Sequence, residues 1–190
     1  MTRNIDAQVK NATKWSAITE ITAKLVTPVT SMVLARLLTP EAYGIIATLS
    51  MIIVFAEIFT DAGFQKYIIQ HEFKNDEEKD QSINVAFWSN LILSVFLWIV
   101  IALFSKPLMR LVGNPGYEIP LIVVCISIPL AAFSSIQMAV YKRDFEYKTL
   151  FKIRIIGILV PLFVTMPCAF ILRDYWALLI GTIASNLINA

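Results

Sequence analysis

The chain has 190 residues, of which 57% are hydrophobic and only 16% are charged, and its mean hydropathy is +0.69. Soluble domains carry about 25% charged residues, so the composition argues against a soluble protein and for an all-α polytopic membrane protein. The net charge of +2 is too small to indicate nucleic-acid binding.

Signals for processing, metals and cofactors are weak. The first fourteen residues are polar and lack the short apolar core of a signal peptide, so no removable signal is expected. Cys125 and Cys168 fall in apolar runs without a metal-binding spacing, and the only histidine, His71, lies in a charged segment. The sequence therefore predicts neither a metal site nor a cofactor.

Six apolar segments are candidates for crossing a bilayer, which takes about 20 residues in a helix. The last is only sixteen residues long, and together they predict one transmembrane domain over residues 1–190. A charged loop is expected at 71–82 and a short interfacial helix near 105–113. The predicted spans are about 15–38, 43–62, 83–104, 119–141, 153–172 and 175–190 (incomplete).

Lysine and arginine are distributed unevenly between the connections. If the N-terminus is cytoplasmic, the inner segments hold 11 of these residues and the outer segments hold 4. Because basic residues favour the cytoplasmic side, we expect a cytoplasmic N-terminus, and six spans would return the chain to that side.

The first span carries a continuous line of polar residues, called here the polar stripe. Its members follow one another at steps of three or four, which places them on one helix face. A charge at membrane depth costs about 2.5–3.5 kcal/mol, so the stripe is expected to face other helices or a water-filled cavity. A Glu20–Lys24 pair that merely neutralises itself within a packed bundle is the alternative. The stripe comprises Thr13, Ser16, Glu20, Lys24, Thr27 and Ser31.

Prolines are expected to interrupt several spans. Lys24 lies eleven residues beyond Thr13, about 16 Å along the helix and so near the membrane midplane. Pro28 cannot donate to the carbonyl of residue 24, which predicts a kink beside Lys24. Similar kinks are predicted at Pro129, Pro161 and Pro167, whereas Pro120 falls near a helix start.

Three further charged residues extend the candidate cavity. Glu57 and Asp61 share a face of the second span, and Asp61 is either solvated at the interface or paired with a cation. Arg154 begins the fifth span, where it either lines the cavity or extends to lipid headgroups. Amides in spans three and six are more typical of contacts between helices. The candidate substrate cavity comprises Glu20, Lys24, Thr27, Ser31, Glu57, Asp61 and Arg154.

Three stretches, taken in order, resemble one known family. They are "LARLLTPEAYGIIA", "FTDAGFQKYIIQ" and "QMAVYKRDFEYKTL", which follow the first, second and fourth spans. In order and spacing they resemble the bacterial polysaccharide-transporter family, the oligosaccharide flippases of the multidrug/oligosaccharidyl-lipid/polysaccharide exporter superfamily. The resemblance extends over residues 15–190.

The resemblance implies two six-helix lobes in a V around a central cavity. It implies translocation of undecaprenyl-diphosphate-linked oligosaccharide across the bacterial cytoplasmic membrane for polysaccharide biosynthesis, by alternating access. Basic residues in such cavities meet the diphosphate, and Lys24 is the best match. Family members have about twelve spans or more, so this six-helix bundle is expected to be the N-terminal lobe, partnered by a C-terminal lobe of the same chain or of another subunit. Membrane lipids are expected partners as well.

Coupling to H⁺ or Na⁺ remains a hypothesis, which transport in vesicles that ignores both gradients would contradict. Three other functions remain open at this stage. A drug/cation antiporter of the same superfamily would need an acidic cavity, which Lys24 disfavours. A membrane scaffold would use the polar stripe only for packing. An intramembrane glycosyl- or phosphotransferase would need clustered aspartates for Mg²⁺, and the acidic residues 75–80 are instead typical of a solvated loop.

Overall fold

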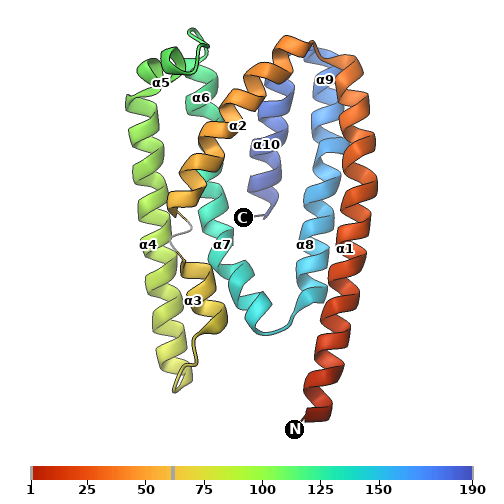
Figure 1. Cartoon of the computed structure of the whole chain (residues 1–190), viewed down its shortest axis with the longest axis vertical. Coiled ribbons are helices and arrows are strands. Elements are labelled where there is room, and N and C mark those ends of the chain that lie inside the picture. The colour runs from red at the N-terminus through yellow and green to blue at the C-terminus, as the bar shows by residue number, and fades with distance from the viewer. Residues whose placement is uncertain (1, 61–62, 190) are drawn as a thin grey trace.

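The protein is all-α in the part that the computed structural model describes, which is residues 2–60 and 63–189, with side chains from Thr13 onward. Figure 1 shows the helices running side by side along one long axis. The elements are α1 (Thr2–Leu37), α2 (Pro40–Thr60), α3 (Phe64–Gln70), α4 (Asp76–Leu103), α5 (Ser105–Leu111), α6 (Glu118–Val124), α7 (Ser127–Arg143), α8 (Tyr147–Val160), the π-helix η1 (Pro161–Thr165), α9 (Met166–Leu172) and α10 (Trp176–Asn189).

Within the described residues, five helical segments are long and apolar enough to cross a membrane, which confirms the prediction of an all-α multi-pass membrane protein. The sixth predicted span is the shorter helix α10. The N-terminus, the turn before α4 and the turn between α7 and α8 lie at the same end of the bundle, as the alternating topology requires (Figure 1). The five segments are Thr13–Leu37, Pro40–Thr60, Asp76–Leu103, Glu118–Arg143 and Tyr147–Leu172.

The charged segment before the third span is partly helical, so its prediction as a loop over 71–82 is wrong beyond residue 75. The Asn75 side-chain oxygen accepts a hydrogen bond from the backbone N–H of Glu78 at 2.8 Å and caps α4. Three acidic residues then occupy the first turn, where the helix dipole favours negative charge. The cap and the acidic turn extend α4 beyond the apolar run.

The prolines act differently from one another. Helix α1 continues through Pro28, so the proline does not interrupt the helix beside Lys24, where the kink is predicted. Pro28 cannot donate the backbone hydrogen bond to the carbonyl of Lys24, and the packing of α1 along α8 and α9 on both sides of Pro28 offsets this loss. Before Pro129 the helix is interrupted between α6 and α7, and the N–H of Ile128 donates to the Cys125 carbonyl at 3.0 Å. Pro161 opens the π-helix η1.

A short helix that the sequence analysis missed, α3, follows α2. Gly63 precedes it with φ 83°, a left-handed conformation that favours glycine. Arg143 of α7 fixes the other end, since its Nη1 donates to the carbonyls of Ile68 and His71, both at 2.6 Å. The same guanidinium lies 4.5 Å from the ring centre of Phe73. Arg143 therefore joins α3 and the following turn to α7.

Helix α10 occupies the middle of the bundle and packs against α6, α7, α8, η1 and α9 (Figure 1). At Gly181 it approaches η1 so closely that an added Cβ would overlap the Thr165 hydroxyl and lie 2.9 Å from Thr165 Cβ. Only glycine permits this separation.

The largest apolar core lies at the end of the bundle away from the N-terminus. It joins α2, α4, α5, α6, α7 and α10. Met109, Leu121 and Leu179 are at its centre and are almost completely buried. The polar cavities described below lie toward the opposite end.

Gly181→Ala is expected to lower stability by about 1–3 kcal/mol, because the new methyl group would force α10 away from η1. The matched control is Gly44→Ala in α2, where an added Cβ would meet nothing within 4 Å. Thermal unfolding in detergent should show a lower midpoint for Gly181→Ala and an unchanged or slightly higher one for Gly44→Ala. Equal midpoints for the two variants would contradict the close approach.

Arg143→Gln should loosen α3 and the turn after it, since two hydrogen bonds from a charged donor are lost, each worth about 1.5–3 kcal/mol. Hydrogen exchange at residues 64–73 should become faster by at least about tenfold, while α4 keeps its protection. Arg110→Gln, at an exposed cation of α5, serves as the control and should leave exchange unchanged. Unchanged exchange in Arg143→Gln would show that Arg143 does not hold α3.

Candidate functional site

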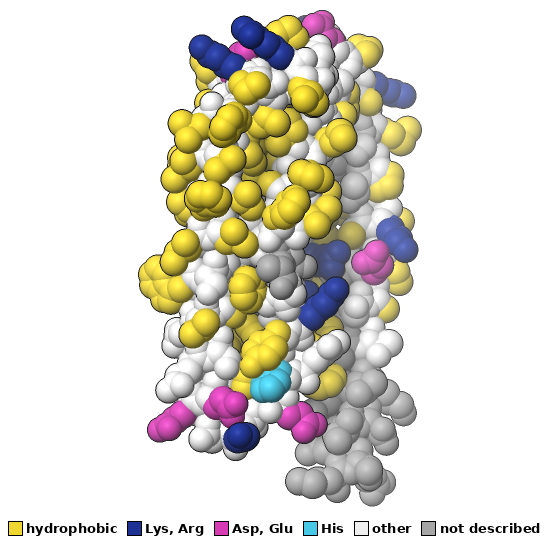
Figure 2. Space-filling model, turned by 60° about the vertical axis from the view of Figure 1, so that its left-hand side comes forward, with side chains coloured by type: hydrophobic (Ala, Val, Ile, Leu, Met, Phe, Trp, Pro, Cys, Tyr) yellow, Lys and Arg dark blue, Asp and Glu magenta, His cyan; other side chains and the backbone are white. Residues whose placement is uncertain are grey.

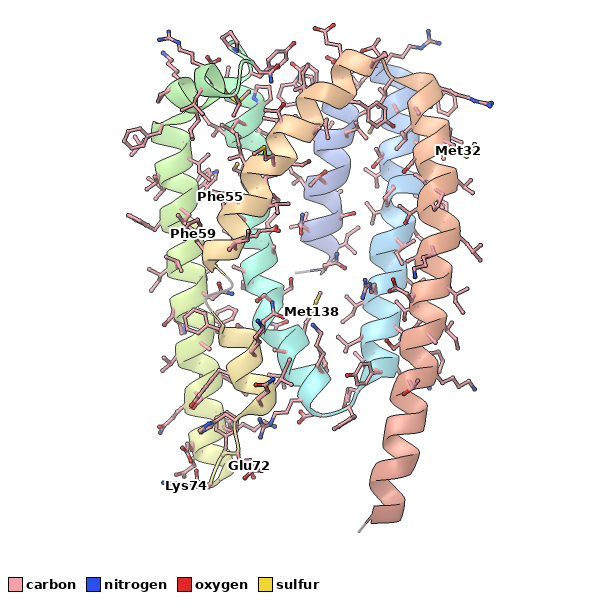
Figure 3. The ribbon with its side chains drawn as sticks, viewed as in Figure 1. Met32, Phe55, Phe59, Glu72, Lys74 and Met138 are labelled. Atoms are coloured by element: carbon pink, nitrogen blue, oxygen red, sulfur yellow. The ribbon has the colours of Figure 1, made fainter. Side chains whose placement is uncertain are left out.

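Helix α1 presents three distinct faces. One face packs on α8 and α9 and buries Thr19, Thr30 and Leu34. Another carries exposed apolar side chains, among them Leu25 and Met32, which are 67% and 65% exposed. Met32 points away from the bundle (Figure 3). The polar stripe forms the third face, beside the contact with α8, so its residues are neither buried in the bundle nor mixed with the apolar face.

Glu20 is the centre of a small charged cluster on the polar stripe. Lys24 Nζ lies 3.9 Å from Glu20 Oε1, and Arg154 Nη2 of α8 lies 4.0 Å from Glu20 Oε2. The side chains of Lys24, Arg154 and Glu20 are 75%, 66% and 53% exposed. Figure 2 shows basic and acidic side chains gathered about halfway along one face of the molecule. With two cations for one carboxylate, the cluster has one positive charge in excess.

A cavity of about 460 Å³, called here the cationic cavity, lies between α1, α7, α8 and the end of α10. Its charged lining residues are Lys142 and Arg154, and neither an aspartate nor a glutamate lines it within the described chain. Trp15 of α1 packs 4.9 Å from Phe151 of α8, ring centre to ring centre, and holds the two helices together beside it. The lining residues are Ser16, Thr19, Met138, Lys142, Tyr147, Leu150, Phe151, Ile153, Arg154, Gly157, Ile158 and Asn189.

A second cavity of about 470 Å³, called here the amide cavity, lies between α2, α3, α4, α7 and α10. It adjoins the cationic cavity because Met138 and Asn189 line both. Met138 projects from α7 toward the interior of the bundle (Figure 3). The one charged residue that lines the amide cavity in the described chain is Glu57. The polar lining residues are Glu57, Thr60, Gln65, Asn90, Ser134, Ser135, Asn186 and Asn189.

The structure brings together part of the predicted site. Glu20, Lys24 and Arg154 form one cluster, and Glu57 lines the amide cavity beside it. Thr27 and Ser31 are exposed farther along α1 and line neither cavity. Asp61 lies outside the described residues. Arg154 contacts Glu20, so in this structure it is an ion-pair partner within the site.

Several lining residues were missed or were interpreted only as helix contacts. Lys142 and Tyr147 come from the basic, aromatic connection between the fourth and fifth spans, whose charge was the available signal. Asn90 and Asn186 were interpreted as contacts between helices, because an isolated amide in an apolar helix usually joins its neighbours. Their convergence on one cavity depends on how α4 and α10 pack against α7.

Among the residues that the structure describes, no three histidine, cysteine, aspartate or glutamate side chains cluster as a metal site would require. The arrangement instead offers fixed positive charge, hydroxyl groups and amides, which suit reversible binding of a polar, anionic molecule.

The long apolar helices define a multi-pass membrane protein. The chain matches the family described as "Polysaccharide biosynthesis protein" over residues 33–190, and it belongs to that family. No solved structure matches the chain.

Curated relatives agree with the family. The chain is 24% identical over 149 residues to "Succinoglycan biosynthesis transport protein ExoT" of Rhizobium meliloti (strain 1021), a match that includes 78% of this chain and 29% of the relative. It is 21% identical over 177 residues to "Lipopolysaccharide biosynthesis protein WzxC" of Escherichia coli (strain K12), a match that includes 93% of this chain and 34% of the relative. It is 29% identical over 94 residues to "Uncharacterized membrane protein in cps region" of Klebsiella pneumoniae, a match that includes 50% of this chain and 19% of the relative. The chain therefore spans about a third or less of the length of these relatives.

Exposure of the polar stripe to water can be tested with single-cysteine variants of the natural protein, in which all native cysteines, Cys125 and Cys168 among them, are replaced by alanine. Thr27→Cys, on the stripe, should react with a charged thiol reagent at least about tenfold faster than Met32→Cys, because charged reagents are excluded from lipid. Met32 is the matched control, since it is exposed five residues along the same helix on the apolar face. Equal rates would show that the stripe does not line a water-filled space.

Proposed function

We propose that this chain forms one lobe of a transporter that moves lipid-linked oligosaccharide across the bacterial cytoplasmic membrane during polysaccharide biosynthesis. The family and the names of its relatives, which refer to succinoglycan transport and lipopolysaccharide biosynthesis, support this function. The observation that carries it is the cluster of Lys24 and Arg154 around Glu20, on the exposed face of a membrane-spanning helix. The N-terminus of the chain is proposed to be cytoplasmic.

The charge of the cluster matches the diphosphate of such a substrate. A lipid-linked sugar has an apolar tail, an anionic diphosphate and a polar glycan, so the tail can remain in lipid while the headgroup needs a polar path. Arginine can bind phosphate through two parallel hydrogen bonds, and lysine acts as a compact positive charge. An arriving diphosphate would compete with Glu20 for Lys24 and Arg154, whereas a cationic drug would be repelled by the excess positive charge.

The exposure of the cluster supports a second lobe facing it. A charge in contact with lipid near the middle of a membrane costs about 2.5–3.5 kcal/mol, and the side chains of Lys24 and Arg154 are 75% and 66% exposed. A water-filled cleft between this lobe and a C-terminal lobe removes that cost, because the charges would remain hydrated. Thr27 and Ser31 would continue the same polar wall along α1, and Glu57 and Asp61 would contribute from the second span.

Alternating access would need the helices to bend without losing their packing. The interruption between α6 and α7 and the π-helix η1 supply positions where two long helices can flex. Both lie within membrane-spanning segments, at Cys125–Ile126 and Pro161–Thr165. We infer that these interruptions permit the lobe to change its tilt between inward-facing and outward-facing states.

Arg154→Gln, made in the natural gene, should reduce polysaccharide export at least about tenfold, because loss of a charged hydrogen-bond donor costs about 1.5–3 kcal/mol and each 1.4 kcal/mol is a factor of ten. Lys24→Gln should act in the same direction. The measurements are surface polysaccharide and the amount of lipid-linked precursor retained on the cytoplasmic side, at matched protein levels in the membrane.

Lys74→Gln is the matched control for these variants. Lys74 is an exposed cation in the turn before α4, away from both cavities (Figure 3), and its loss should leave export unchanged. Normal export in both Lys24→Gln and Arg154→Gln would reject the proposed role of the charged cluster and would favour a packing role of the polar stripe in a scaffold.

A further inference from the structure

The polar groups of the amide cavity are unevenly satisfied. Asn90 is only 2% exposed, and its Nδ2 donates to Ser135 Oγ at 3.2 Å, yet its Oδ1 is buried without a hydrogen-bond partner in the described chain. Gln65 Nε2 donates to the same Ser135 oxygen at 3.3 Å. Leaving a buried acceptor unpaired costs about 1–3 kcal/mol, so Asn90 Oδ1 is available to a bound partner at a net gain.

Other oxygens around the cavity are also unpaired. Asn186 Nδ2 donates to the Thr182 carbonyl at 3.1 Å, and no hydrogen bond to the side-chain oxygen of Asn186 or Gln65 forms within the described residues. The Glu57 carboxylate has neither an ion-pair partner nor a hydrogen-bond donor among those residues. The cavity thus presents acceptors, while several of its donors are already engaged.

This balance defines the chemistry of a ligand. A diphosphate supplies only acceptors and negative charge, so it fits the cationic cavity and is disfavoured beside Glu57. A ligand for the amide cavity must donate hydrogen bonds or carry positive charge. The cavity has a volume of about 470 Å³ with acceptors on four helices, which favours a ring bearing several hydroxyl groups over a single ion held by converging oxygens.

We propose that the amide cavity binds a sugar ring of the transported headgroup, through hydroxyl groups that donate to Glu57, Asn90 and Asn186. The inference rests on the proposed function. It divides the headgroup between two adjoining sites, with the diphosphate at Arg154, which belongs to both the charged cluster and the cationic cavity, and the sugar on the other side of Met138.

The test measures binding of two lipids to the full-length natural protein in lipid nanodiscs. One is a polyprenyl diphosphate, and the other is the same lipid carrying a single N-acetylhexosamine. The unaltered protein should bind the sugar-bearing lipid at least about fivefold more tightly, since one or two hydrogen bonds contribute that much. Asn90→Leu, which has a similar volume, should abolish this preference and leave affinity for the bare lipid within about twofold. Asn186 is half-exposed, so Asn186→Ala puts folding less at risk, and it should reduce the preference for the sugar-bearing lipid at least about twofold.

The control for amide loss is Asn114→Ala, because Asn114 lies between α5 and α6 and donates to Thr48 instead of lining either cavity. It should keep the full preference. Equal binding of the two lipids by the unaltered protein would overturn the sugar site while leaving the proposed function intact. A loss of binding to both lipids in Asn90→Leu and Asn186→Ala would also overturn it, by indicating a structural role.

Two further outcomes separate the remaining explanations. If neither lipid binds the unaltered protein, the proposed function fails and the sugar site fails with it. Repeating the titrations in sodium chloride and in choline chloride tests for an ion site. If Na⁺ stabilises the protein, Asn90→Leu removes that stabilisation, and neither lipid is preferred, the proposal is overturned and the cavity is assigned to a cation.

Discussion

The close approach of α10 to η1 at Gly181 and Thr165 is the contact on which the rest of the bundle depends. Helix α10 packs against the elements of the fourth and fifth spans, so its position determines how α6, α7, α8 and α9 are spaced. A larger residue at Gly181 would move α10 away from η1. With α10 in this position, Leu179 enters the core with Leu121 and Met109, and the core closes at the end away from the N-terminus.

The distribution of polar groups follows from that core. At the closed end, apolar side chains fill the space between helices, and the buried residues there need few polar partners. Toward the N-terminal end, α1, α3 and α8 bring serine, threonine, amide and charged side chains against α7, and two adjoining cavities result. The polar residues therefore gather toward the N-terminal end of the bundle, around the two cavities.

Two of the three stretches that carry the family resemblance contact each other in the structure. The second includes Gly63 and α3, and the third includes Arg143, which donates to the carbonyls at the end of α3. Lys79 adds an ion pair with Asp144 at 3.4 Å between the neighbouring turns. Two segments about 70 residues apart thus form one unit at the N-terminal end. The arrangement places Lys142, adjacent to Arg143, in the wall of the cationic cavity.

Sequence alone determined the membrane class, five of the spans to within several residues, the polar stripe on α1 and the family. The first three depend on composition and on helical periodicity, which are local properties, whereas the family was identified from its resemblance in three sequence stretches. It also gave Glu20 and Lys24 as a possible pair, because residues four apart on a helix are neighbours. Continuity through Pro28, the helix α3 and the π-helix η1 depended instead on packing between helices, so local propensity could not predict them.

Only the tertiary structure decided which residues share a cavity. Arg154 joins Glu20 because α8 packs on α1, and Asn90 and Asn186 meet around one space because α4 and α10 both pack on α7. These residues lie far apart in the chain, and their own segments give each of them an ordinary role as a helix contact or an interfacial cation. Periodicity fixes the face of a helix that a residue occupies, whereas its partners are fixed by the rotation and depth of the neighbouring helices.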